Sequence, residues 1–132
     1  MAQPLASGIV LTIAVVTSAC SGQEAALHQH QEKLASLTAS TTVIANAWLA
    51  GSTSGTYTST ALERISTLLE NERAALASNP QLLVDSRGAT MSQSAERFSR
   101  LLAAMQRDVR VSDPRSLRQR VSDLPHLSAE PR

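Results

Sequence analysis

The chain is poor in the residues that build sheets and disulfides. Trp48, Tyr57 and Phe98 are its only aromatic residues, and β-branched residues, which also favour strands, are sparse after residue 20. Cys20 is the only cysteine, so no intramolecular disulfide can form. The fold must therefore hold together by packing, and the Ala, Leu, Ser, Arg, Gln and Glu that dominate the composition favour helices.

The sequence also has little that supports catalysis. Lys33 is the only lysine, so neither a Ser-x-x-Lys pair nor a phosphate-binding glycine loop with its lysine is present. No serine lies in a Gly-x-Ser-x-Gly elbow, and Glu70 and Glu72 lie two apart, which turns them to different sides of a helix. We therefore predict a protein that is not an enzyme, with no catalytic residues and no cofactor.

The first part of the chain lacks charge altogether. No charged side chain occurs between Met1 and Gln23, and an apolar run extends from Leu5 to Ala19. The run is shorter than the roughly 20 residues of a membrane-spanning helix, but it has the length of the hydrophobic region of a signal peptide. The run ends in small residues, as a signal peptidase requires, so residues 1–19 are predicted to be a signal peptide.

Thr17-Ser18-Ala19-Cys20 closes this run and resembles the lipobox of bacterial lipoproteins. The resemblance covers about the first 20 residues and implies that Cys20 is acylated on sulfur, with cleavage just before it. It further implies a lipid anchor in the cell envelope facing the periplasm. Ser21 stands where an Asp tends to retain such proteins in the inner membrane, so the outer membrane is expected. Plain secretion or an uncleaved anchor are the alternatives.

The rest of the chain has the spacing of amphipathic helices. The first stripe, at alternating intervals of three and four, contains Leu27, His30, Leu34, Leu37, Thr41, Ile44 and Trp48. Helices are predicted over about residues 24–50, 56–78, 89–111 and 114–124, with a Gly-Ser-Thr loop at 51–55 and a connection at 80–90 that includes a turn at Asp85–Gly88. Thr60–Glu63 fits a capping box, which would move the start of the second helix to Ala61.

These elements predict an all-α fold, an antiparallel up-down helical bundle of three long helices plus a short C-terminal helix. The expected bundle domain covers residues 20–125, and residues 126–132 are expected to be a flexible tail. No family is recognised for this domain.

Histidines and carboxylates near the start of the bundle form only a weak candidate metal site. Glu24, His28 and Glu32 share one helix face at intervals of four, whereas His30 lies on another side. A solvated polar face explains the same pattern, so no metal site is assigned.

Charge is divided unevenly along the chain. Residues 20–86 carry an excess of acids, whereas seven arginines and only two aspartates occur between residues 97 and 120. Arginine binds carboxylate and phosphate through two parallel hydrogen bonds, which makes these residues a candidate face for an anionic partner. The face contains Arg97, Arg100, Arg107, Arg110, Arg115, Arg118 and Arg120. The alternative is that these arginines solvate their helices and pair with acids of the second helix.

The sequence as a whole predicts a lipid-anchored structural or protein-interaction module. Its expected partners are the membrane, through the anchor, and another protein or further copies of itself, but not nucleic acid, because an exported protein does not meet it. A periplasmic protein that binds a ligand or metal between its helices is the alternative.

Overall fold

Helices are the only regular secondary structure in the described part of the chain. The computed structural model describes residues 14–127, with side chains from residue 22 onward, and contains no strand within that range. Its elements are α1 (Ala14–Leu49), α2 (Gly55–Ala77), α3 (Pro80–Val84), α4 (Ser86–Arg110), α5 (Pro114–Asp123) and the 3-10 helix η1 (Leu124–Leu127). The all-α prediction is confirmed. Most of the predicted signal peptide, residues 1–13, lies outside the described residues.

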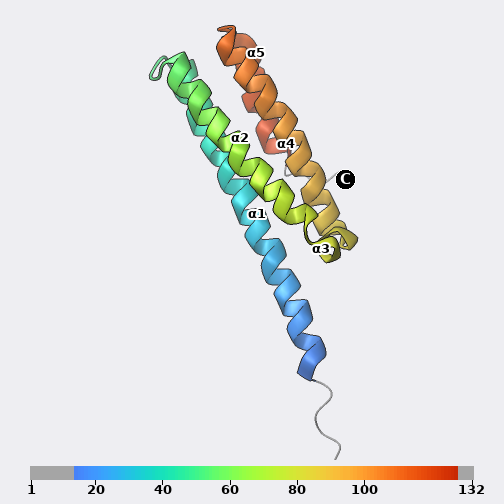
Figure 1. Cartoon of the computed structure of the whole chain (residues 1–132). Coiled ribbons are helices and arrows are strands. Elements are labelled where there is room, and N and C mark those ends of the chain that lie inside the picture. The colour runs from blue at the N-terminus through green and yellow to red at the C-terminus, as the bar shows by residue number, and fades with distance from the viewer. Residues whose placement is uncertain (1–13, 128–132) are drawn as a thin grey trace, which may run out of the picture.

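The three longest helices lie side by side (Figure 1). α1 leads to a loop at one end of the molecule, α2 leads from that loop to α3 at the other end, and α4 begins beside α3. α5 and η1 follow α4 and contact both α4 and α1. The first turns of α1 project beyond the end that carries α3 (Figure 1). None of the described helices is long and apolar enough to cross a membrane.

The predicted start of the first helix is wrong, and so is the later start at Ala61 considered for the second helix, whereas its predicted start at about residue 56 lies one residue from the observed one. α1 begins at Ala14 rather than Glu24, because no proline or other strong helix breaker separates the apolar run from the bundle. α2 begins at Gly55, where the Ser54 hydroxyl accepts from the Tyr57 amide at 3.1 Å. The Thr60 hydroxyl does not cap a helix; it donates to the Thr56 carbonyl at 3.0 Å inside α2. An earlier serine therefore provides the cap.

The predicted turn at Asp85–Gly88 is also wrong. Asp85 is the N-cap of α4 and accepts from the Arg87 amide at 2.9 Å, so Gly88 lies in the first turn of a helix. Gly88 is buried because the backbone of α3 packs directly on it: a Cβ atom added there would lie 1.8 Å from the Leu82 carbonyl oxygen. Glycine at this position allows two backbones to touch rather than making a turn.

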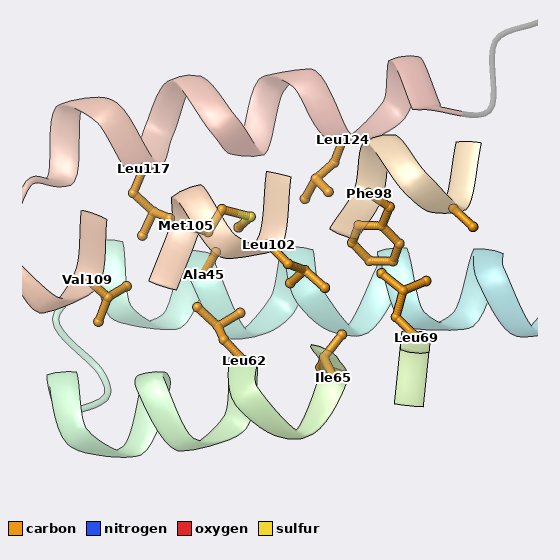
Figure 2. Close-up of a cluster of buried hydrophobic side chains, with 11 residues drawn as sticks. Ala45, Leu62, Ile65, Leu69, Phe98, Leu102, Met105, Val109, Leu117 and Leu124 are labelled. Carbon is orange, nitrogen blue, oxygen red and sulfur yellow. The ribbon is translucent and has the colours of Figure 1, made fainter. Parts of the chain in front are cut away.

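The core is mainly aliphatic and comes from four α-helices and η1 (Figure 2). Leu62 and Leu69 of α2 point toward Leu102 of α4, and Leu117 of α5 closes the cluster near Val109. Each such side chain contributes roughly 1.5–3 kcal/mol when fully buried. The buried apolar residues of this cluster are Ala45, Leu62, Ile65, Leu69, Ala95, Phe98, Leu102, Met105, Val109, Leu117 and Leu124. The core therefore fixes how α4 and α5 meet, which decides where the arginines lie.

Candidate functional site

An ion-pair cluster ties the start of α4 to α1 at the α3 end. The Arg87 guanidinium donates to both carboxylate oxygens of Glu24, at 2.6 and 3.0 Å, and also to Asp85 at 2.9 Å. Hydrogen bonding to Arg87 lowers the pKa of Glu24 and of Asp85, and the two carboxylates together raise the pKa of Arg87. Beside this cluster, the Gln23 amide donates to the Gln81 carbonyl at 3.2 Å. These ion pairs hold the start of α4 against α1.

The weak metal candidates are not brought together. Glu24 is turned to Arg87, while His28 Nε2 lies 3.1 Å from Glu32 Oε1 on the exposed side of α1. Among the residues with described side chains, no group of three His, Cys, Asp or Glu is placed to hold a metal ion. His126 is exposed in η1.

A buried charged contact links α1 to α2, and sequence reasoning missed it. Glu72 is only 6% exposed, and its carboxylate accepts from His30 Nδ1 and lies 3.7 Å from Lys33 Nζ. Glu70 instead faces Arg73 and Ser99 on the surface, and the hydrogen bond from Ser99, followed by that from Arg73, lowers its pKa. The signal was present in the sequence, because His30 lies in the apolar stripe of the first helix, where a histidine needs a polar partner.

Two of the seven arginines pair with acids of their own neighbourhood. Arg100 contacts Glu96 at 3.2 Å within α4, and Arg120 Nε lies 3.5 Å from Asp108 Oδ2, across the α4–α5 contact. Neither pairs with α2, so the alternative of pairing with second-helix acids is wrong for them. The other five, which form no ion pair among the described residues, are Arg97, Arg107, Arg110, Arg115 and Arg118.

Four of these five lie where α4 meets α5. Arg107 and Arg110 occupy the last turn of α4, and Arg115 and Arg118 lie in the first two turns of α5. All four are exposed, and the turn of residues 111–113 joins the two helices. We call these four residues the arginine tip. The fold thus concentrates part of the predicted anionic-partner face at one end of the bundle.

Hydrogen bonds fix the turn that carries the arginine tip. The Asp113 amide donates to the Asp108 carbonyl at 2.8 Å, and Ser112, with φ of 54°, adopts the left-handed conformation that reverses the chain. Asp113 Oδ1 then accepts from the Ser116 amide at 3.1 Å and caps α5. This backbone hydrogen bond and that from the Ser116 hydroxyl lower the pKa of Asp113. The tip is therefore a shaped surface rather than a loose loop.

A partly open apolar groove lies between α1 and α4. Its volume is about 390 Å³, and Phe98, Met91 and Leu34 form much of its apolar wall. α5 and η1 pack between α1 and α4 over the other part of the bundle, and Leu127 of η1 ends that coverage at the groove. The full lining is Gln31, Leu34, Ala35, Thr38, Arg87, Thr90, Met91, Ser94, Ala95, Phe98 and Leu127. Such a groove can take a small uncharged ligand, since Arg87 is already neutralised.

Comparison with known proteins adds no relative. No protein-family model, no curated protein and no solved structure matches the chain.

Proposed function

We propose that the chain is a non-enzymatic, lipid-anchored protein of the bacterial cell envelope whose helical bundle acts as an interaction module. Cys20, at the end of the uncharged apolar run, carries this proposal. The bundle is, in this proposal, an antiparallel up-down arrangement of three long helices with a short C-terminal helix. It faces the periplasm, and the Ser after Cys20 favours the outer membrane.

The course of α1 supports a tether at residue 20. The backbone of Cys20 lies in α1, three residues before Gln23, which makes the first tertiary hydrogen bond described, to Gln81. At 1.5 Å per residue, the separation along the helix is about 5 Å. A membrane held at Cys20 would therefore lie close to α3.

The surface of α3 is compatible with that position. Val84 is 88% exposed and its neighbour Leu83 is 36% exposed, although both are apolar. Apolar side chains next to a lipid anchor add to membrane binding by burying surface in the headgroup region. Because one acyl chain holds a protein only marginally whereas two hold it stably, a diacylated cysteine is a sufficient tether.

Metabolic labelling with radioactive palmitate tests the anchor. The wild-type chain and the control Ser21→Ala should both incorporate label, whereas Cys20→Ser should incorporate none. The mature wild-type protein should also lack residues 1–19 when its mass is measured. Equal labelling of wild type and Cys20→Ser, or a mature protein that retains those residues, would refute the anchor.

The groove between α1 and α4 favours a second function, the binding of a small apolar molecule. Its volume of about 390 Å³ lies within the range of ligand pockets, and its walls are mainly apolar, with polar groups that include the hydroxyls of Thr90 and Ser94. Native mass spectrometry of the purified protein would reveal such a ligand as added mass.

A further inference from the structure

The arginine tip carries four positive charges that no acid of the described residues neutralises. Arg107, Arg110, Arg115 and Arg118 are exposed and form no ion pair among the residues described, whereas Arg87, Arg100 and Arg120 are each paired with an acid. We propose that the arginine tip is a docking surface for an acidic segment of a partner protein. The inference deepens the proposed role as an interaction module by naming the chemistry of the partner.

Helix electrostatics do not account for the charge on α5. Arg107 and Arg110 lie in the last turn of α4, where a cation is favourable because the helix dipole is negative there. Arg115 lies in the first turn of α5, where the dipole is positive and a cation is unfavourable. Only Asp113 offsets it locally, and the side chain of Asp113 is already occupied by Ser116. The helix dipole therefore does not favour Arg115 at this position, and an anion bound beside it would add a favourable interaction.

The turn at residues 111–113 fixes the backbone of the arginine tip before a partner binds. The Val111 amide donates to the Arg107 carbonyl at 3.0 Å, and the Ser112 amide donates to the Val109 carbonyl at 3.1 Å. Asp108 and Arg120 face each other across α4 and α5, and Leu117 is fully buried below them. A surface whose backbone is fixed before binding loses less conformational entropy when the partner arrives.

The chemistry of the tip fits carboxylates on a protein. Each guanidinium presents a planar fork that matches a carboxylate, and lysine, which lacks the fork, is absent from this end of the molecule. Val111, 66% exposed in the same turn, adds an apolar contact of the kind that a protein surface can accept. The arginines and this valine together form a small mixed surface.

The position of the tip disfavours the tethering membrane as its partner. α1 extends about 44 Å from Cys20 to Leu49 at 1.5 Å per residue, and α5 begins at that far end (Figure 1). Charges in water are screened over about 8 Å at physiological ionic strength. When α1 stands perpendicular to the membrane, the headgroups around an anchor at Cys20 therefore exert little attraction on the arginine tip.

Binding of an acidic peptide to the full chain in non-ionic detergent tests this inference. The probe is a fluorescein-labelled peptide of alternating Glu and Ser, followed by anisotropy, with a Gln-Ser peptide as its uncharged counterpart. Wild type should bind the acidic peptide and not the uncharged one. Arg115→Gln/Arg118→Gln should weaken binding about tenfold, as expected for two partly exposed charge contacts.

The matched control removes the same charge elsewhere on the arginine-rich segment. Arg97→Gln/Arg100→Gln should bind within twofold of wild type, and coincident thermal unfolding should show that both variants are folded. Arg115→Lys/Arg118→Lys keeps the charge without the fork and should bind with intermediate affinity. Equal weakening by both Gln pairs, or no binding by wild type, would overturn the proposal.

Competition with an anionic lipid tests whether the arginine tip prefers protein carboxylates or lipid phosphates. A short-chain phosphatidylglycerol below its micellar concentration should displace the acidic peptide poorly, and displacement at lower concentration than the unlabelled peptide would overturn the assignment to a protein partner. Palmitate labelling reports on the anchor alone, so failure of peptide binding and failure of the lipid anchor are distinguished.

Discussion

The two ends of the bundle use charge in opposite ways. At the α3 end, Arg87 is bound by Glu24 and Asp85, and Gly88 brings the backbones of α3 and α4 into contact. At the α4–α5 end, backbone and cap hydrogen bonds shape the turn, while four arginines remain without ion pairs among the described residues. At the α3 end, ion pairs between side chains hold the helices together. At the α4–α5 end, the arginine side chains are exposed to solvent. The difference separates residues that stabilise the fold from residues available to a partner.

Replacing Gly88 is the strongest way to disrupt the α3 end. Gly88→Ala places a Cβ atom 1.8 Å from the Leu82 carbonyl oxygen, and because both groups belong to backbones, α3 must move away from α4. We expect a loss of about 3 kcal/mol in the free energy of unfolding, at the upper end of the cost of overpacking. Urea denaturation followed by circular dichroism measures it.

Gly22→Ala is the matched control. No atom lies within 4 Å of a Cβ at Gly22, and alanine favours a helix over glycine by about 1 kcal/mol, so this variant should be as stable as wild type or more so. Gly88→Ala with wild-type stability would mean that α3 does not pack on α4 as described.

Glu72 tests the buried contact on the α3 side of the bundle. Glu72→Ala leaves the largely buried His30 without its carboxylate partner, so we expect a loss of about 2 kcal/mol. Glu70→Ala removes a surface carboxylate from the same helix and should change stability by less than about 0.5 kcal/mol. Thermal or urea unfolding of the two variants side by side gives the comparison. Similar losses for both would show that burial of Glu72 has no energetic role.

Acid should weaken the α3 end through Arg87, although by less than either substitution. The pKa values of Glu24 and Asp85 are lower in the folded chain than their ordinary values of 4.5 and 3.8. Their contribution to stability is therefore complete above those ordinary values and is lost as the pH falls through the folded ones. The urea midpoint should fall as the pH drops below about 5, and it should fall less in Arg87→Gln.

The opposite end provides the comparison for this titration. The pKa of Asp113 is lowered mainly by hydrogen bonds from Ser116. The Asp113 carboxylate therefore also stabilises the fold when the pH is above its ordinary pKa of 3.8, but this contribution does not depend on Arg87. Asp113→Asn should therefore leave the salt dependence of the midpoint at pH 7 largely unchanged, whereas Arg87→Gln should reduce it. Identical pH profiles for wild type and Arg87→Gln would contradict the role of Arg87.

The long helices were predictable because their apolar periodicity is sustained over many turns. Ala95, Phe98, Leu102 and Met105 of α4 recur at intervals of three and four and are buried, and α5 begins at Pro114 as predicted. Local signals of this kind depend only on neighbouring residues.

The parts that failed depend on contacts between distant residues. Gly88 reads locally as a turn, and only the approach of Leu82 explains why it lies in a helix. Glu72 reads as a surface acid until His30, 42 positions away in the chain, is placed against it. The arginines were found as a set, but the division into paired and unpaired members required the packing of α5 on α4.

The unbroken course of α1 has a mechanical consequence. A glycine-serine linker would let the bundle swivel freely, whereas a continuous helix resists bending and twisting. α1 contains no proline between Ala14 and Leu49, and α2 is packed along it. A torque applied at Cys20, the proposed point of attachment, is therefore transmitted along α1 through the bundle, which acts as a stiff lever with the α4–α5 turn at the end of its long arm.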